Sequence, residues 1–312
     1  MHDARSPDRP ASVRMSAGTR LPDSAGPLHG QNVLLSGASR GLGHALAHAF
    51  ARRGANLLLV ARSAKQLEDL CGELQRVARP EQSVALAADL SEPGAGARII
   101  AHARGLWPRL DVLVNNAAVL GPIGACWEND WQEWLRTLQI DLLAPVELCR
   151  AAAPWMRAQA GGRIINLSGG GATTPRPRFS AYATAKAALV RFSEVLAAEL
   201  ADAGVCVNCV APGAMNTDMA EEVRRAGPQR AGETEFGQAV KLAGQDAERA
   251  TCRAVELILF LASPTGPRIS GRLISAVWDP WESLPERSGD IAASDIYTLR
   301  RIVPQDRGQR WT

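Results

Sequence analysis

The sequence predicts an α/β fold in which helices cover both faces of one doubly wound parallel sheet. Short apolar runs such as NVLLSG and NLLLVA alternate with longer segments of helical periodicity, such as LGHALAHAFARRG. Continuous apolar runs are typical of strands buried on both faces, and strands that are joined through helices run parallel. The 312 residues are 46% apolar and 21% charged, which suffices for a full core and excludes a mainly disordered chain.

Each element of the expected sheet follows from this alternation in chain order. Apolar runs that end at glycine or small polar residues predict strands, and segments with a 3.6-residue apolar repeat predict helices. We therefore expect strands at 32–37, 56–61, 83–90, 110–118, 162–169, 205–213 and 271–277, and helices at 42–54, 63–78, 96–107, 130–159, 180–204 and 248–263. The series contains no fixed internal repeat, so one Rossmann-type domain is predicted.

Composition separates this domain from two flanking segments. Residues 1–30 are rich in Pro, Ser, Ala and Arg and lack strand or helix periodicity, which predicts a disordered N-terminal tail. The predicted domain spans 31–276, and 277–312 form an aromatic extension. The large apolar residues of this extension are Trp278, Trp281, Tyr297, Leu299, Ile302 and Trp311. Because these are too many for a free tail, we expect the extension to pack on the core or on a neighbouring subunit.

Charge and hydropathy limit the expected partners and compartment. The formal net charge of +3 is small for this length, which argues against nucleic acid as a partner. No run approaches the roughly 20 apolar residues that cross a bilayer, and the N-terminus lacks the apolar region of a secretory signal. We therefore expect a cytoplasmic protein with no membrane partner.

The cysteines give no sign of a metal centre. Only Cys206 and Cys209 are close in sequence, and they lie in the expected strand VCVNCVAPG. No second pair of Cys or His residues with ligand spacing follows, so small strand residues are the favoured interpretation over a redox or zinc site. We predict reduced thiols and no structural metal.

A glycine-rich turn joins the first expected strand to the first expected helix. Glycines in such a turn let the backbone approach a pyrophosphate, and the helix N-terminus offers unpaired N–H groups to it. The G-x-x-x-G-x-G arrangement differs from the usual G-x-G-x-x-G fingerprint, and a plain tight turn is the alternative. The candidate cofactor-binding residues here are Gly37, Ser39, Arg40, Gly41, Leu42 and Gly43.

The end of the second strand indicates which dinucleotide binds. NAD sites place a carboxylate there for the ribose hydroxyls, whereas NADP sites use arginine for the 2′-phosphate. The sequence reads Val60-Ala61-Arg62-Ser63, with no acid, and Arg40 of the glycine turn lies within reach of the same phosphate. We predict NADP(H) in preference to NAD(H); a solvated arginine is the alternative.

At this point the chain resembles the classical short-chain dehydrogenase/reductase family, NADP-preferring, from Gln31 to about Val277. The motifs that carry the resemblance are the glycine turn, AADLS, Asn115-Asn116-Ala117-Ala118, the Y-x-x-x-K pair and Pro212-Gly213-Ala214-Met215-Asn216-Thr217. In the family the motif that follows AADLS reads N-N-A-G; in this chain Ala118 stands in place of the final glycine. The resemblance implies that the cofactor contacts are Asp89 and Leu90 at the adenine, Asn116 and Ala117 near the turn, and Pro212, Gly213 and Thr217 over the nicotinamide.

Tyr182 and Lys186 are the candidate proton-transfer pair. Four residues apart on an expected helix, they share one face, so the ammonium favours the phenolate and makes the phenol a better acid. A Y-x-x-x-K pattern alone is common on solvated helix faces. Its position directly after the strand GRIINLSG makes it a catalytic candidate that also contacts the cofactor.

Two further positions depart from the family's pattern. The resemblance implies a serine thirteen residues before Tyr182, but that position is Gly169, so we assign Ser168 the role of polarising the substrate oxygen. The alternative is that Ser168 only ends the strand and that Thr173 or Thr174 substitutes at a distance. The family's water-anchoring asparagine corresponds to Asp141, which if buried near Lys186 is expected to pair with it or take up a proton.

The remaining candidates concern the substrate side. The resemblance implies a mobile lid over 218–245, and its polarity and glycines suit a flap that orders on binding. Trp127, Trp131 and Trp134 form a second candidate wall, although their spacing fits helix packing better.

We predict an NADP(H)-dependent oxidoreductase acting on a carbonyl or secondary alcohol of a small molecule, assembled as a homodimer or homotetramer. The alternatives are an NADP(H)-binding protein without turnover, and a dehydratase or epimerase on the same fold.

Overall fold

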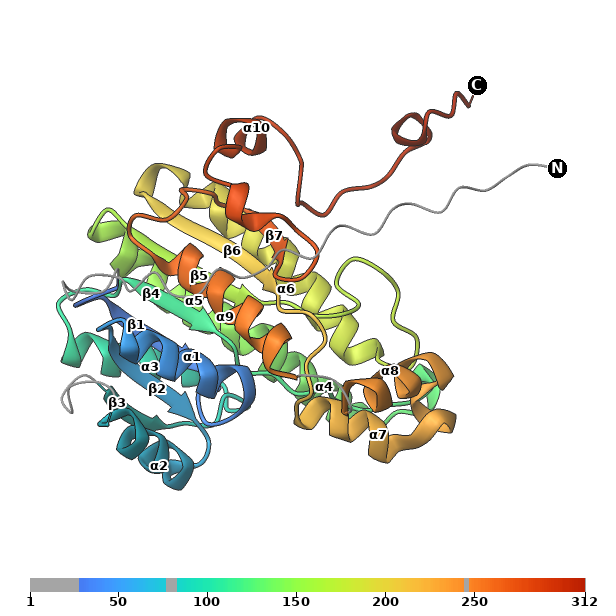
Figure 1. The fold of residues 1–312 in the computed structure, drawn as a ribbon, viewed down its shortest axis with the longest axis horizontal. Coiled ribbons are helices and arrows are strands. Elements are labelled where there is room, and N and C mark those ends of the chain that lie inside the picture. Colours follow the sequence, from blue (N-terminus) through green and yellow to red (C-terminus); the bar gives the residue numbers. More distant parts are fainter. Residues whose placement is uncertain (1–27, 77–82, 244–246, 312) are drawn as a thin grey trace.

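A computed structural model describes residues 28–76, 83–243 and 247–311. It contains a seven-stranded parallel sheet in the order β3-β2-β1-β4-β5-β6-β7 (Figure 1). The strands are β1 (Asn32–Ser36), β2 (Asn56–Ala61), β3 (Ser83–Ala87), β4 (Val112–Asn115), β5 (Gly162–Leu167), β6 (Val205–Ala211) and β7 (Arg272–Ser275). The order reverses between β1 and β4, which is the switch point where ligands bind in doubly wound sheets.

Helices cover both faces of this sheet. They are α1 (Gly41–Arg52), α2 (Ala64–Leu74), α3 (Ala95–Leu106), α4 (Trp131–Leu138), α5 (Ala144–Ala158), α6 (Ser180–Glu199), α7 (Asp218–Ala231), α8 (Glu233–Ala243), α9 (Ala247–Ala262) and α10 (Ser288–Ala292). Alternate residues of β1 divide the core: Val33 and Leu35 pack with α1, α2 and α9, whereas Leu34 packs with α3, α5 and α6. The predicted doubly wound parallel fold is therefore confirmed.

The N-terminal boundary lies earlier than expected. Leu28 is buried in the core cluster of α1, and the backbone N–H of Gly30 donates to the carbonyl of Gly54 at 2.9 Å. Residues 28–30 therefore belong to the domain, because a buried leucine anchors them, and the rest of the predicted tail lies outside the described residues.

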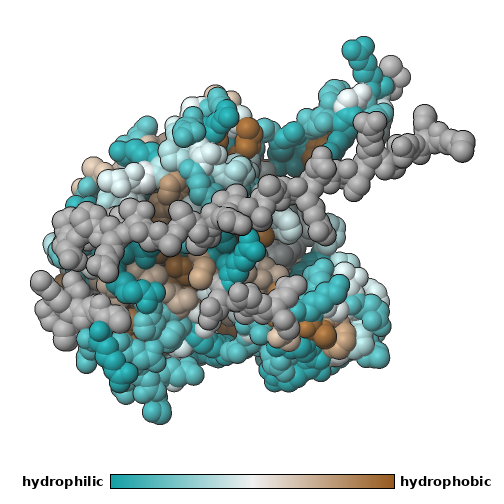
Figure 2. All heavy atoms as spheres, in the orientation of Figure 1, coloured by the Kyte–Doolittle hydropathy of each residue, from teal (hydrophilic) through white to brown (hydrophobic). Residues whose placement is uncertain are grey.

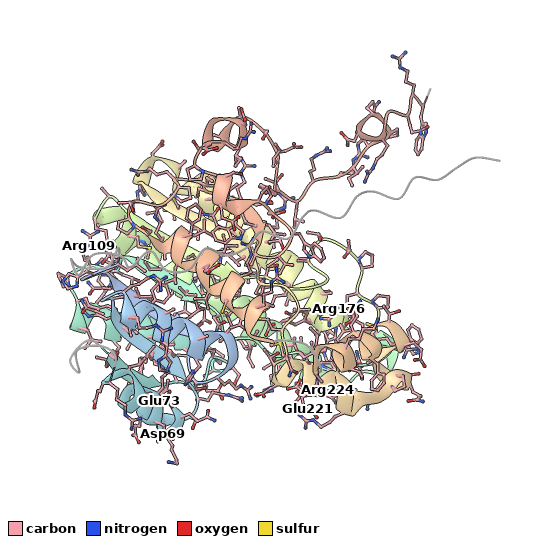
Figure 3. All side chains as sticks on the ribbon, in the orientation of Figure 1. Asp69, Glu73, Arg109, Arg176, Glu221 and Arg224 are labelled. Carbon is pink, nitrogen blue, oxygen red and sulfur yellow. The ribbon has the colours of Figure 1, made fainter. Side chains whose placement is uncertain are left out.

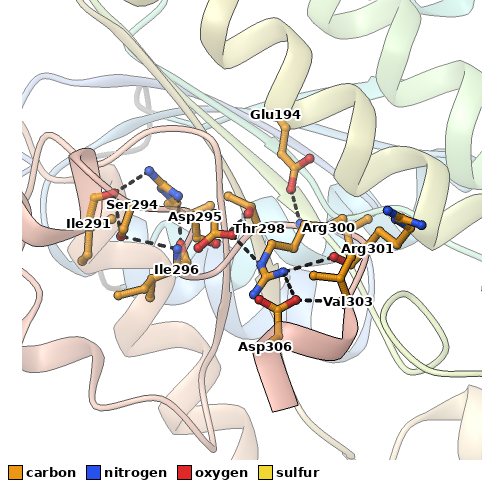
Figure 4. Close-up of polar contacts among 12 residues, drawn as sticks. Glu194, Ile291, Ser294, Asp295, Ile296, Thr298, Arg300, Arg301, Val303 and Asp306 are labelled. Carbon is orange, nitrogen blue, oxygen red and sulfur yellow. Dashed lines mark hydrogen bonds and ion pairs between the residues drawn. The ribbon is translucent and has the colours of Figure 1, made fainter. Parts of the chain in front are cut away.

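The C-terminal extension packs on its own core along its first half. Trp281, Leu284 and Ile291 are buried in the same cluster as α1 and α9. Farther on, the backbone N–H of Leu299 donates to Glu194 of α6 at 2.6 Å, and Arg300 pairs with Asp306 (Figure 4). Beyond this anchor the chain leaves the body (Figure 1), and Ile302 and Trp311 are 59% and 76% exposed.

The segment that was expected to be a flap forms two helices, α7 and α8. They make a lobe beside the carboxyl ends of the central strands (Figure 1). A kink at Gly227, with φ of 73°, interrupts α7, and Gly232, with φ of 85°, joins the two helices. The surface over α2, on the opposite side of the molecule, is almost entirely hydrophilic (Figure 2).

Candidate active site

A cavity of about 1700 Å³ opens at the carboxyl ends of the central strands. It is lined by every residue that the sequence analysis proposed for cofactor binding or catalysis, except Asp141. Residues 39–43 and 212–217 both line it, although they lie far apart along the chain. The lobe of α7 and α8 contributes Met219, Arg224 and Glu235, and the C-terminal extension contributes Trp278 and Tyr297.

The glycine turn is shaped to expose its backbone. A Cβ atom on Gly43 would overlap the carbonyl oxygen of Gly37, whereas Gly41 meets nothing closer than Thr217 Cγ2 at 3.8 Å. Helix α1 has no acidic residue in its first turn and no side-chain cap, so its first N–H groups and its positive dipole end are free for an anion. This cradle fits the pyrophosphate of a dinucleotide.

Asn116 holds the turn in place. Its side-chain nitrogen donates to the carbonyl oxygens of Ser36 and Gly37 at 3.1 and 3.0 Å. In return, the Ser36 hydroxyl accepts from the backbone N–H groups of Asn116 and Ala117. This explains why an Asn-Ala pair follows β4: the amide bridges β4 to the turn that follows β1.

The residues predicted for the adenosine end line one side of the cavity. The N–H and hydroxyl of Ser91, each at 2.8 Å, hold the pKa of the Asp89 carboxyl below its usual value, with a smaller contribution from Arg62. Arg62 is exposed, whereas Arg40 pairs with Asp218 at the start of α7 at 2.6 Å. A phosphate bound by Arg40 therefore competes with the Asp218 carboxylate.

Tyr182 and Lys186 are buried on the cavity side of α6. The Lys186 ammonium lies 3.3 Å from Asp141 Oδ2 and donates to the carbonyl of Leu167 at 3.1 Å. Asp141 is fully buried behind the cavity wall, and its other oxygen accepts from the backbone N–H of Val119 at 2.8 Å. The expected pairing of Asp141 with the lysine is present.

A π-helical turn places Asp141 opposite the lysine. The stretch expected as one helix over 130–159 contains a π segment, Gln139–Leu143, between α4 and α5. Pro145 lacks the N–H that would bond the carbonyl of Asp141 four residues earlier, and the N–H of Ala144 bonds Gln139 five residues back. The extra residue in this turn rotates the helix face so that Asp141 points inward.

Burial and three charged side chains shift the pKa of Tyr182 in opposite directions. Burial raises the pKa of the Tyr182 phenol, Lys186 and Arg176 act to lower it, and Asp141 acts to raise it. Burial also raises the pKa of Asp141 against the pull of Lys186. For Lys186, burial acts to lower the pKa, but Asp141 and Tyr182 outweigh it and raise the pKa above its usual value. The aspartate therefore weakens the effect of the lysine on the phenol.

The structure places Gly169, not Ser168, opposite the phenol. A Cβ atom on Gly169 would overlap the Tyr182 hydroxyl, so a side chain at this position would face the reacting oxygen. Ser168 is the residue before it, and its backbone N–H donates to Val210 at 2.8 Å. Among the cavity-lining residues that the structure describes, Ser168 alone has a buried side-chain oxygen without a hydrogen-bond partner. Thr173 and Thr174 also line the cavity, but both are exposed.

Sequence reasoning missed an arginine beside the phenol. The Arg176 guanidinium forms two hydrogen bonds to Glu235 of α8, at 3.1 and 2.7 Å. Figure 3 labels Arg176 beside α8. It lies 4.1 Å from the ring centroid of Phe179 and 5.6 Å from that of Tyr182. The pair joins residues 59 positions apart, so the sequence held no local signal for it.

Other candidates lie outside the cavity. Trp131 and Trp134 stack on each other with ring centroids 5.2 Å apart, and Trp134 donates to Ser180 at 3.1 Å. Neither tryptophan lines the cavity, and Trp127 is 86% exposed. Trp134 thus contacts α6, as helix packing predicts, whereas Trp131 is 60% exposed. Cys206 and Cys209 are buried on β6, as a strand interpretation requires.

Comparisons with known proteins agree with this geometry. The family model described as short chain dehydrogenase matches residues 31–227. Oxidoreductase UcpA of Escherichia coli strain K12 is 32% identical over 265 residues, covering 84% of this chain and 97% of that protein. The chain belongs to the short chain dehydrogenase family.

Solved structures extend this likeness to three dimensions. A short chain dehydrogenase of Salmonella enterica serovar Typhi is 26% identical with a TM-score of 0.70, over 82% of this chain and 100% of that one. The NADP complex of RhlG from Pseudomonas aeruginosa is 25% identical with a TM-score of 0.66, over 80% and 95%. This short chain dehydrogenase is thus an NAD(P)-dependent oxidoreductase that acts on a small molecule. Among its described helices, none is both long and apolar enough to span a membrane.

Proposed function

We propose that this short chain dehydrogenase is an NADP(H)-dependent reductase or dehydrogenase that interconverts a carbonyl and a secondary alcohol, with Tyr182 as the acid and base. The observation that carries the proposal is the buried Tyr182 and Lys186 pair, which lines the same cavity as the glycine turn. When bound, the nicotinamide supplies or accepts hydride, so the protein has to supply only the proton.

The chain's own residues account for the remaining tasks. The Tyr182 phenol donates its proton to the substrate oxygen in reduction and removes it in oxidation. Lys186 stabilises the phenolate and binds the nicotinamide ribose. We assign Ser168 as the second donor to the substrate oxygen, because its buried hydroxyl lacks a partner within the protein. Asp141 positions Lys186 rather than contacting the substrate.

Two arginines support a preference for NADP(H). Arg62 follows β2 where an NAD site would carry an acid, and Arg40 lies in the glycine turn. Titration of the protein with NADPH and with NADH, followed by cofactor fluorescence, tests this preference. We expect NADPH to bind at least tenfold more tightly, and Arg62→Ala to remove most of the difference. Tighter binding of NADH would contradict the proposal.

Turnover is tested with a carbonyl panel and NADPH absorbance, comparing the parent with Tyr182→Phe. We expect the variant to lose more than a hundredfold in kcat, because the proton donor is gone while the cavity keeps its shape. Tight NADPH binding without turnover of any carbonyl by the parent would favour the alternative of a cofactor-binding protein. Gly169 supports this alternative, because the position opposite the Tyr182 phenol carries no hydroxyl group.

A further inference from the structure

Two histidines and a glutamate converge where α1 and α2 run side by side. His44 and His48 lie one turn apart on α1, with ring centroids 4.8 Å apart. The Nε2 atoms of both rings lie 3.0 Å from the same oxygen, Oε2 of Glu73. Figure 3 labels Glu73 on α2. The potential ligand atoms of the three residues all lie within 4.8 Å of one another. Two separate helices thus aim three metal-ligating side chains at one point.

The donor set matches the preferences of zinc. Two imidazole nitrogens and one carboxylate oxygen are common Zn²⁺ ligands, and a three-residue site leaves a fourth tetrahedral position for water. Ligand atoms at zinc bond lengths of about 2.1 Å lie roughly 3.4 Å apart in a tetrahedron. Both nitrogens lie 3.0 Å from the oxygen, slightly less than this spacing, so closure around an ion needs only small rotations of the three side chains.

The surroundings allow this closure. The side chains of His44, His48 and Glu73 are 37%, 19% and 46% exposed, so solvent reaches the site and the side chains have room to rotate. Histidine spacing of i, i+4 presents both rings on one helix face.

The cluster is separate from the active site. Residues 41–43 of α1 and Gln66 of α2 line the cavity, whereas His44, His48 and Glu73 do not. An ion held by these three residues would therefore link α1 to α2 outside the cofactor cavity.

We propose that His44, His48 and Glu73 form a binding site for one Zn²⁺ ion that links α1 to α2. Helix α1 begins directly after Arg40, and α2 begins shortly after Arg62, the two arginines proposed to bind the cofactor phosphate. The zinc site does not depend on that role of the arginines. Zinc bound here stabilises the folded chain, because the three ligands are brought together only in the native state.

Isothermal titration calorimetry with zinc chloride on tag-free, full-length protein tests the proposal. The exposed thiols of Cys126 and Cys252 are first replaced by serine, because thiolates bind zinc on their own. We expect one equivalent to bind to this parent and to raise its Tm. Both His48→Asn and Glu73→Gln are expected to weaken binding at least tenfold and to abolish the rise in Tm.

Two exposed residues outside the cluster provide matched controls. His102→Asn removes an exposed histidine of α3, and Asp69→Asn removes an exposed carboxylate one turn before Glu73. Both controls should bind zinc like the parent. The cluster is overturned if the parent binds no zinc, or if the double variant His44→Asn/His48→Asn binds it with unchanged affinity and stoichiometry. Tm values measured without zinc establish that each variant is folded.

Discussion

At the scale of single residues, Tyr182 lies among charges of both signs. Lys186 and Arg176 favour its phenolate, and Asp141 disfavours it. The chain has two tyrosines, so Tyr297→Phe leaves Tyr182 as the only phenol, and its titration can be followed by ultraviolet difference absorbance near 295 nm. The charges around this phenol are therefore measurable without a substrate.

In this background, Asp141→Asn is expected to lower the pKa of Tyr182, since it removes a negative charge that opposes the phenolate. Arg176→Gln should raise the pKa by removing a cation. Reduction needs the protonated phenol, so the alkaline loss of reductase activity should move to lower pH in Asp141→Asn and to higher pH in Arg176→Gln. Titration curves that coincide with the parent would show that neither charge acts on Tyr182.

Ser168 provides a second prediction at this scale. Loss of one hydrogen-bond donor to a reacting oxygen costs about 10²–10³ in kcat, so Ser168→Ala should lose that much with little change in NADPH affinity. Thr174→Val is the matched control, because Thr174 also lines the cavity but is exposed, and it should keep nearly full activity. Equal activity in Ser168→Ala and the parent would leave Tyr182 as the sole side-chain donor.

The residues of the site differed in how far the sequence could predict them. The i, i+4 spacing of Tyr182 and Lys186 is a local property of one helix, so the pattern was sufficient. The choice between Ser168 and Gly169 depends on the path of a loop, which a glycine run leaves open. The contact of Arg176 with Glu235 depends on tertiary packing, which no local pattern encodes.

At the scale of elements, the turn between β1 and α1 depends on Gly43. A side chain there would collide with backbone rather than with a movable side chain. Gly43→Ala is therefore expected to weaken NADPH binding at least tenfold and to lower Tm. Gly72→Ala in α2 meets nothing within 4 Å and should instead stabilise the helix, by about 0.5–1 kcal/mol. Fluorescence titration and thermal unfolding of both variants, side by side, measure the contrast.

The elements themselves were largely predictable, because apolar runs and helical repeats follow from burial on both faces of the sheet. The π segment Gln139–Leu143 was missed because apolar periodicity barely changes when one residue is inserted. The polarity and glycines of 218–245 suit a flap, and this segment contains no apolar repeat that would predict the helices α7 and α8. Their order comes from contacts across the chain, such as Arg178 to the carbonyl of Gln229 at 2.8 Å.

At the scale of the whole molecule, the C-terminal extension divides into a packed part and an exposed part. Removal of 304–312 should leave the free energy of unfolding within about 0.5 kcal/mol of the parent, because none of the side chains described there, 304–311, is buried. Removal of 278–312 takes away Trp281, Leu284 and Ile291, each worth about 1.5–3 kcal/mol of burial. Urea unfolding of the two truncated chains measures this contrast, and equal stabilities would contradict the packing.

The cavity is bordered by two segments that lie outside the glycine turn and outside the helix that carries Tyr182. One is the lobe of α7 and α8, and the other is the stretch that carries Trp278 and Tyr297. The proposed proton-transfer residues and these bordering segments therefore come from separate parts of the chain, joined by the Arg40–Asp218 and Arg176–Glu235 pairs. For protein engineering, we expect that the bordering segments can be randomised to change substrate scope while the proton-transfer residues keep their surroundings, provided that Asp218 and Glu235 are retained.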